Sequence, residues 1–456
     1  MMKSLLFAVS MLLASSVQAL AQEFESATSA VKNMRVGWNL GNTLDANSGS
    51  TTNMWIEKWK EGRTPSDYET AWGQPVTTEA LIKMFKDAGF NAIRVPVTWY
   101  PHMGVVNNEL NWDIDSWTPT KVDEKWMARV KEVVDYVINN GMYCIINVHH
   151  DTGNATTAWI RANTANYNKY KDTFEDLWTQ IATEFKDYDE HLLFEGYNEM
   201  LDSYGSWCFA SFAAPGNYNA DSAADSYKAV NKYAQSFVNA VRATGGNNSY
   251  RNLIINSYCA SNGSGNWNEH LLEPLKNLAY PEDEAQNHIA FQVHYYPSIK
   301  DLSWAKTECA MMLSDIKKYL QNRAPVIFGE WGTSNNLVKN EKGDGYKDDY
   351  YTSYKQNKIN FAKFFVEECK KADIATFYWM MLSDCEDRAN PTWTMPDLKD
   401  AIIKGYYGND GYTTSIEGVS ETSSSKILKP QKLIHKDKVI IANGDDKYTI
   451  AGTKLK

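Results

Sequence analysis

Cysteine is scarce in this sequence, and its few cysteines do not have the spacing of a metal site. Six cysteines occur among 456 residues, and no two of them form a C-x-x-C motif. We therefore expect neither a bound metal nor a cofactor. Cysteines of an exported protein can form disulfides, and the sequence leaves their pairing open.

An excess of positive charge is also missing. The chain has 46 Lys and Arg residues against 56 Asp and Glu residues, a formal net charge of -10 at pH 7. An acidic protein repels nucleic acids and anionic membrane surfaces, so we expect neither as a partner and favour a neutral polymer. After the N-terminus, no apolar run is long enough to span a bilayer, so we expect no membrane span. We further expect a monomer.

The first 21 residues have the pattern of a secretory signal peptide. Lys3 supplies a positive charge, residues 4–14 form a short apolar run, and Ala19 and Ala21 form a small-x-small cleavage site. The apolar run is too short for a membrane helix. We therefore expect cleavage near Ala21 and a secreted protein, either free outside the cell or at its surface. No cysteine lies near this site, which argues against a lipid anchor there.

Strand-like and helix-like segments alternate along most of the chain. Apolar runs bounded by turn residues predict eight strands, at residues 34–40, 90–96, 142–148, 192–196, 252–256, 289–293, 326–329 and 374–379. Amphipathic segments predict helices at residues 78–88, 123–139, 167–185, 223–243, 267–278, 304–320, 351–371 and 397–404. Eight such units predict an α/β fold, a (β/α)8 TIM barrel, with its active site at the carboxyl ends of the strands.

The composition changes after Gly405. Residues 415–425 are rich in Ser, Thr and Glu and are typical of a flexible linker. Beyond them, apolar runs at 439–441 and 448–450 flank Asn443 and Gly444, which predicts a β-hairpin. We therefore expect a signal peptide at 1–21, a barrel domain with the active site at 22–411, a linker at 412–425 and a hairpin tail at 426–456.

Two of the predicted strands lead into glutamates. The segment FEGYNE at 194–199 ends with Glu199, and the segment VIFGEWG at 326–332 contains Glu330. A carboxylate at a buried strand end is costly to desolvate unless it has a partner. Hydrolysis of a glycosidic bond is the reaction that most needs two carboxylates. The 16 Trp and 27 Tyr residues also suit a sugar cleft, although a large barrel buries many aromatic rings in any case.

Several motifs, most of them at the predicted strand ends, match those of a known enzyme family. They are GWNLGNTLDA at 37–46, AWGQP at 71–75, AGFNAIRVP at 88–96 and the Asn-Glu pair at 198–199. With these motifs the chain resembles glycoside hydrolase family 5, and within it the branch of endo-β-1,4-glucanases and xyloglucanases. The resemblance covers about residues 31–405. It implies a retaining endo-β-1,4-glucanase that cleaves internal links of β-glucan polysaccharides by double displacement.

The resemblance also implies a role for each matching residue. Glu199 would be the general acid/base and Glu330 the nucleophile, with Arg94 keeping Glu330 ionised. Tyr296 would donate a hydrogen bond to Glu330. Four other matching residues are expected to bind substrate: Asn198, His149, His294 and Trp379. Asn198 would bind the 2-hydroxyl, and Trp379 would lie under the sugar that is cleaved. His150, which follows His149, is expected to contact the glycan without a catalytic role.

Several interpretations stay open at this point. Glu195, within the fourth strand, fits a salt-bridged structural residue. With the same mechanism, the preferred substrate could be xyloglucan, mixed-linkage glucan or mannan, which would make the enzyme a xyloglucanase, a licheninase or a mannanase. A non-catalytic glycan-binding barrel is the alternative from another class, and the intact catalytic set argues against it. Four loop tryptophans could be sugar platforms or packing residues: Trp55, Trp59, Trp159 and Trp207.

The C-terminal tail has a resemblance of its own. The segments ILK at 427–429, VIIANG at 439–444 and YTIAG at 448–452 resemble the short sorting domains of Bacteroidetes cargo of type IX secretion. This resemblance implies that the tail is an export signal. An ordinary hairpin that packs on the barrel is the alternative.

Overall fold

The computed structural model describes residues 24–59, 64–106, 109–110, 121–214, 217–333, 337–339, 346–348, 354–412, 431–435, 438–443, 446–449 and 454–455. The expected signal peptide, 1–21, and the expected linker beyond residue 412 lie outside these residues. The chain divides into two compact units, Met1–Thr413 and Thr414–Lys456.

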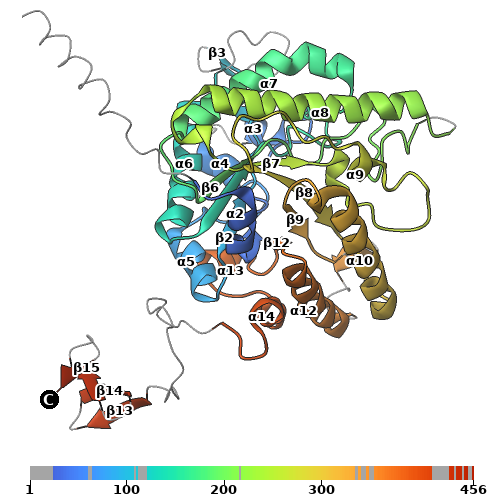
Figure 1. The fold of residues 1–456 in the computed structure, drawn as a ribbon. Coiled ribbons are helices and arrows are strands. Elements are labelled where there is room, and N and C mark those ends of the chain that lie inside the picture. Colours follow the sequence, from blue (N-terminus) through green and yellow to red (C-terminus); the bar gives the residue numbers. More distant parts are fainter. Residues whose placement is uncertain are drawn as a thin grey trace, which may run out of the picture. The chain divides into compact units, whose positions relative to one another are not determined.

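Eight parallel strands close into a barrel in the first unit (Figure 1). Each strand pairs with its neighbours in chain order, and the last strand pairs with the first. The strands are β1 (Val36–Asn39), β2 (Ala92–Val95), β5 (Tyr143–Asn147), β6 (Leu192–Glu195), β7 (Leu253–Asn256), β8 (Ile289–Tyr295), β9 (Val326–Trp331) and β12 (Ala375–Trp379). All eight overlap the predicted strands, and the TIM barrel is confirmed.

Helices surround the barrel between successive strands (Figure 1). Their apolar stripes face the strands: α5, for example, buries Leu81, Ile82 and Phe85. Its first turn is capped by Thr78, whose side chain accepts from the backbone N–H of Leu81. The helices are α3 (Trp55–Trp59), α4 (Pro65–Glu69), α5 (Glu79–Asp87), α6 (Glu124–Asn139), α7 (Thr164–Glu184), α8 (Ala220–Ala243), α9 (Glu273–Asn277), α10 (Leu302–Ile316), α12 (Lys355–Lys371), α13 (Glu386–Ala389) and α14 (Pro396–Tyr407).

The first described helix, α2 (Ala27–Met34), was not predicted. It buries Ala27, Ala30, Val31 and Met34 in one cluster with side chains of the barrel interior, among them Ile145 and Ile254. This helix therefore covers the amino end of the barrel and leaves the carboxyl end open. Because Met34 belongs to α2, the strand predicted at 34–40 is shorter than expected and begins at Val36.

The helix predicted at 267–278 is also shorter than expected. Only α9, of five residues, is helical there. Pro274 lies in its first turn, and a proline is tolerated there but not further inside a helix, so the helix cannot begin much earlier. Leu278 is in an extended conformation, which ends the helix.

Four short strands form two antiparallel pairs outside the barrel. β3 (Val105–Val106) pairs with β4 (Glu109–Leu110), and β10 (Leu337–Lys339) pairs with β11 (Tyr346–Asp348). The six cysteines all carry free thiols. Among the residues that the structure describes, none of the helices combines the length and the apolar character needed to cross a membrane.

The second unit contains a four-stranded antiparallel sheet. Its strands are β13 (Gln431–His435), β14 (Lys438–Asn443), β15 (Asp446–Thr449) and β16 (Lys454–Leu455), paired in this order. The predicted hairpin corresponds to β14 and β15. The outer strands β13 and β16 are additions that the sequence pattern did not indicate.

Candidate active site

The predicted site residues lie together at the carboxyl end of the barrel. Barrel strands carry Arg94 (β2), His294 (β8), Glu330 (β9) and Trp379 (β12). The remaining members follow directly after β5, β6 and β8: His149, His150, Asn198, Glu199 and Tyr296. Residues far apart in the sequence meet here because parallel strands of a barrel end at the same rim.

Glu330 is almost fully buried and has two hydrogen-bond donors. Nη1 of Arg94 lies 2.8 Å from its Oε1, and the hydroxyl of Tyr296 donates to its Oε2 at 2.7 Å. Burial alone would raise the pKa of Glu330. The charges of His294 and Arg94 and the hydrogen bonds from Tyr296 and Arg94 outweigh burial and lower this pKa below its ordinary value. Glu330 is therefore held as a carboxylate.

Glu199 lies opposite Glu330 and is more accessible. Nδ1 of His294 is 2.8 Å from Oε1 of Glu199 and 3.5 Å from Oε2 of Glu330. One oxygen of each carboxylate and one nitrogen of His294 all lie within 4.8 Å of one another. Carboxyl groups about 5 Å apart are the geometry of a retaining glycosidase, because an inverting enzyme needs room for a water between them.

Arg94 is fully buried inside the barrel and forms hydrogen bonds with several residues of the site. Its guanidinium donates to Glu195 at 2.6 and 2.8 Å, to Glu330 at 2.8 Å, to Asn39 at 2.9 Å and to Asn198 at 2.8 Å. Burial alone would lower the pKa of Arg94, but the charges of Glu195 and Glu330 and the hydrogen bonds to them raise it above its ordinary value. The salt-bridged interpretation of Glu195 agrees with these contacts.

Three asparagines that the sequence analysis did not single out complete this network. Asn39 donates to the backbone oxygen of Gly329 at 2.9 Å. Asn147 and Asn256 donate to Oε1 of Glu195 at 3.1 and 3.2 Å. Each asparagine is the last residue of its strand, and this shared position was the available signal in the sequence.

His149, His150 and Trp379 form the neighbouring part of the rim. The rings of His149 and Trp379 are nearly parallel, with centroids 5.9 Å apart. His150 contacts the ring of Trp72 at 5.4 Å, and its Nε2 is 3.6 Å from Oδ2 of the buried Asp45. Flat rings beside Glu330 provide a surface on which a sugar can stack.

Two groups of residues at this rim have distances that would suit a metal ion. They are Asp45, His149 and His150, and Glu199, His294 and Glu330. In the second group, a cation would compete with Arg94 and Tyr296, which already donate to Glu330. These contacts favour acid–base chemistry of the carboxylates over metal binding.

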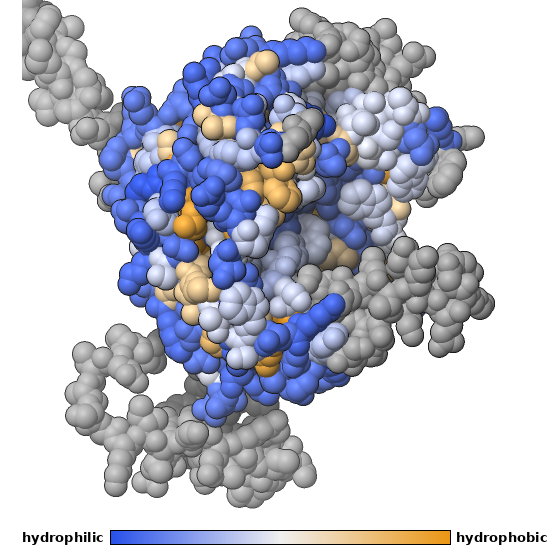
Figure 2. All heavy atoms as spheres, turned by 90° about the vertical axis from the view of Figure 1, so that its right-hand side faces the viewer, coloured by the Kyte–Doolittle hydropathy of each residue, from blue (hydrophilic) through white to orange (hydrophobic). Residues whose placement is uncertain are grey.

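A pocket of about 470 Å³ lies beside Glu199, and Trp379 is not among the residues that line it. Its walls include Glu199, His294 and Tyr296 and three exposed tryptophans: Trp207 (48% exposed), Trp267 (56%) and Trp304 (46%). Figure 2 looks at this end of the barrel, where the surface is mostly hydrophilic and hollowed near its centre. Of the four loop tryptophans, Trp207 thus lies in a position to contact substrate, whereas Trp159 is buried and bonded to Asp151.

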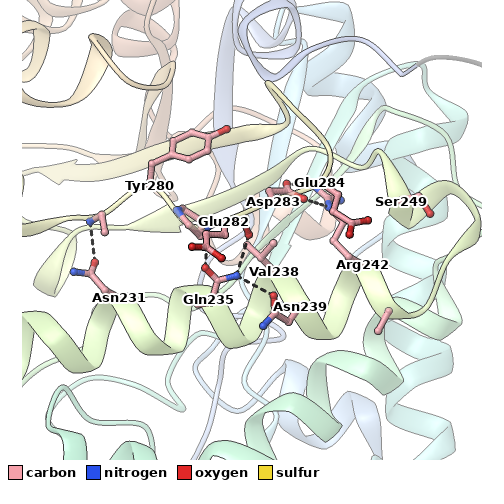
Figure 3. A pocket seen from close by; sticks show the side chains of 13 residues that line it. Asn231, Gln235, Val238, Asn239, Arg242, Ser249, Tyr280, Glu282, Asp283 and Glu284 are labelled. Carbon is pink, nitrogen blue, oxygen red and sulfur yellow. Dashed lines mark hydrogen bonds and ion pairs between the residues drawn. The ribbon is translucent and has the colours of Figure 1, made fainter.

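A larger groove, of about 970 Å³, lies between α8 and the segment 279–284 and is not part of this site (Figure 3). Asn231 and Gln235 of α8 bind backbone groups of the segment 277–282, and Arg242 pairs with Asp283 at 2.8 Å. The polar side chains of the groove thus hold this segment against the helix.

Comparison with known proteins identifies the family. A family description, "Cellulase (glycosyl hydrolase family 5)", matches residues 49–382. The chain belongs to glycosyl hydrolase family 5. It is a glycoside hydrolase of the family's endoglucanase branch, and the resemblance read from the motifs is confirmed.

Two solved structures and one curated relative illustrate the likeness. A GH5-4 broad specificity endoglucanase from an uncultured bacterium is 51% identical, with a TM-score of 0.75 over 86% of this chain and 98% of that chain. A family 5 enzyme from Prevotella bryantii, solved with a xyloglucan tetradecasaccharide, is 39% identical, with a TM-score of 0.69 over 84% of this chain and 99% of that chain. A cellulase/esterase from Acetivibrio thermocellus is 31% identical over 83% of this chain, which spans 40% of that relative's length.

Proposed function

We propose that this chain is a retaining endo-β-1,4-glucanase that cleaves internal links of β-glucans. The observation that carries the proposal is the pair Glu199 and Glu330, with carboxylate oxygens within 4.8 Å and different surroundings. Glu330 is buried and held ionised by Arg94, whereas Glu199 is more exposed and is bound by His294. One carboxylate is thus suited to attack and the other to proton transfer.

In the first step, Glu330 attacks the anomeric carbon and the bond from this carbon to the leaving oxygen breaks. Glu199 gives its proton to that oxygen, so the leaving sugar departs as an alcohol. In the second step, Glu199 takes a proton from a water molecule, which attacks the anomeric carbon and releases Glu330. Two displacements at the same carbon retain the anomeric configuration.

The surroundings of the two carboxylates indicate where the polysaccharide lies. The sugar under attack would stack on Trp379, with Asn198 at its 2-hydroxyl and His149, His150 and His294 beside it. The leaving sugar must lie next to the acid that protonates it, which is the side of Glu199. The pocket with Trp207, Trp267 and Trp304 is on that side and offers aromatic surfaces for further sugar units.

The similar structures indicate which β-glucans the enzyme would cleave. One similar structure is of a broad specificity endoglucanase and another contains a xyloglucan oligosaccharide, so xyloglucan is the leading second substrate. Lichenan and mannan are further candidates with the same chemistry. A non-catalytic glycan-binding barrel is disfavoured because all the groups required for catalysis are present.

Processing and export belong to the same proposal. A signal peptide at 1–21, cleaved near Ala21, would deliver the protein outside the cell, where polysaccharide is found. The barrel domain would then comprise 22–411, joined by the linker at 412–425 to the tail at 426–456. We propose that this tail is a sorting signal and that the enzyme acts as a monomer.

A product profile tests the proposed activity. Purified protein is incubated with carboxymethyl cellulose, xyloglucan, lichenan and glucomannan, and new reducing ends and viscosity are followed together. A rapid fall in viscosity with few new ends is expected on at least one β-1,4-glucan, since internal links are cut. The variant Glu330→Gln is the control for contaminating activity. Equal product from wild type and variant, or no product from any polymer, contradicts the proposal.

A further inference from the structure

Asn147, at the end of β5, is fully buried and has a defined side-chain orientation. The backbone N–H of Val97 donates to its Oδ1 at 3.1 Å. A backbone N–H can only donate, so the atom that faces Val97 must be the oxygen of the amide. The nitrogen Nδ2 therefore faces the other way, where it lies 3.0 Å from Nδ1 of His149 and 3.1 Å from Oε1 of Glu195.

This orientation determines where His149 carries its hydrogen. Both hydrogens of the Asn147 amide are donated, one to Glu195 and the other to Nδ1 of His149. A neutral imidazole has one N–H and one acceptor nitrogen, so a ring that accepts at Nδ1 carries its hydrogen on Nε2. Burial, together with the charges of His150, Arg94 and His294, lowers the pKa of His149 well below its ordinary value, which keeps the ring neutral.

We propose that Asn147 is a positioning residue that fixes His149 as a neutral Nε2–H donor at the catalytic centre. Nε2 of His149 lies 3.9 Å from Oε1 of Glu330, beyond direct hydrogen bonding, beside the ring of Trp379. Its hydrogen thus points to the place where a hydroxyl of the attacked sugar would lie. The opposite tautomer would present a lone pair to the Glu330 carboxylate and to that hydroxyl. This inference rests on the proposed function.

The charged groups around His149 do not set this tautomer by themselves. His150, Arg94 and His294 face the ring as neighbours of positive or potential positive charge, Glu330 lies beyond Nε2, and Asp45 belongs to the same cluster. Among the residues that the structure describes, Nδ2 of Asn147 is the group that forms a hydrogen bond with Nδ1. Glu195 acts on His149 through Asn147, because it takes the other hydrogen of the same amide.

The test compares Asn147→Ala and Asn147→Asp with the matched variant Asn256→Ala. Asn256 is a buried strand-end asparagine that also donates to Oε1 of Glu195, at 3.2 Å, but has no bond to His149. Protein labelled with nitrogen-15 in its eight histidines is measured by NMR, which distinguishes the two tautomers. The variant His149→Gln assigns the signal. Steady-state kinetics on a soluble β-glucan oligosaccharide are measured alongside.

Wild type and Asn256→Ala are expected to show His149 with its hydrogen on Nε2. Asn147→Ala should show a mixture of tautomers. Asn147→Asp, which keeps an oxygen for Val97, should show the hydrogen on Nδ1. Both Asn147 variants should lose about ten- to a hundredfold in kcat/KM, with most of the loss in kcat if the donor acts mainly in the transition state.

Two results overturn the inference. One is a wild-type His149 with its hydrogen on Nδ1, and the other is an unchanged Nε2–H signal in folded Asn147→Asp. If Asn147→Ala does not fold, Asn147→Asp decides alone. The NMR signal is measured without substrate, so it does not depend on the proposed activity. If the proposed activity is wrong, wild type and all variants are inactive on the β-glucan, but the tautomer of His149 is still as expected.

Discussion

Arg94 and Glu195 form a two-pronged ion pair inside the barrel, and neither side chain is exposed to solvent. The bonds from Nε and Nη2 of Arg94 to Glu195 are 2.6 and 2.8 Å long. Because the guanidinium is planar, this pair fixes the direction of Nη1, which donates to Glu330. Glu195 thus orients Arg94, which binds the nucleophile Glu330. It also offsets part of the positive charge of Arg94.

The first prediction concerns the stability that this ion pair provides. Glu195→Gln leaves buried donors of Arg94 without a charged acceptor, and breaking a buried pair costs about 3 to 5 kcal/mol. We expect a loss of this size in the free energy of unfolding, measured by urea denaturation at pH 7. The control is Asp87→Asn, which removes an ion pair with Lys83 in which both side chains are 61% exposed. It should change stability by less than about 0.5 kcal/mol. Similar losses in both variants would contradict the prediction.

The second prediction separates the roles of the two carboxylates. Glu330→Ala should abolish turnover, and added azide should partly restore it by forming a glycosyl azide of inverted configuration. Glu199→Ala should slow the cleavage of glucans far more than that of aryl glycosides, because a good leaving group needs little protonation. Initial rates on both substrate types are the measurement. Equal losses on glucan and aryl glycoside in Glu199→Ala would exclude Glu199 as the acid.

The third prediction concerns the acid limb of the pH profile. Activity requires ionised Glu330, and Arg94 is one of the causes that lower the pKa of this carboxyl. In Arg94→Met, the charge and the hydrogen bond of Arg94, which lower this pKa, are lost. The burial of Glu330, which raises the pKa, remains. The pKa should therefore rise, and the acid limb of kcat/KM should move to higher pH. The profile is measured from about pH 3 to 8, since ordinary Glu values lie near 4.3.

A matched variant controls for the removal of an arginine as such. Arg129 is also paired with a buried glutamate, Glu69, at 2.9 Å, but it lies on α6 and has no bond to either catalytic carboxylate. Arg129→Met should leave the acid limb where it is. If the acid limb does not move in Arg94→Met, or if it moves equally in both variants, Arg94 does not set the pKa of that limb.

The fourth prediction concerns the tryptophans on the side of Glu199. Trp267→Ala removes an aromatic wall of the pocket that is proposed to receive the leaving sugars. We expect a loss of about fivefold in kcat/KM on a long oligosaccharide, because stacking on an aromatic ring is worth on the order of 1 kcal/mol. Cleavage of an aryl glycoside, which places no sugar there, should change little. Tyr250→Ala is the control, since this exposed ring precedes β7 at the opposite end of the barrel.

The barrel and much of its site could be predicted because the signals are local. Apolar runs alternate with amphipathic segments, and Glu199 and Glu330 stand where such runs end. Helix α2 was missed because its eight residues carry a short apolar stripe and lead straight into β1. Nothing in that stripe indicates that it covers the end of a barrel, which depends on closure of the whole sheet.

The supporting asparagines were missed for a related reason. Asn39, Asn147 and Asn256 each end a strand, and an asparagine after an apolar run is equally typical of a turn. Two of their partners, Gly329 and Glu195, lie on other strands and are identified only when the strands are placed side by side. A buried polar network is therefore less predictable from sequence than the groups that it supports.

The last prediction concerns the C-terminal tail. The predicted catalytic residues all precede Gly405, and the chain divides into units near residue 413. A truncated protein of residues 22–411 should therefore fold and cleave glucan with nearly full activity. In the native host, the same truncation of the tail should block export across the outer membrane, because a sorting signal acts as an address and contributes nothing to catalysis. Activity of purified protein and location in fractionated cells are measured, with full-length protein as the control. Normal export after truncation would exclude the sorting role, and loss of activity or stability would favour a tail that supports the barrel.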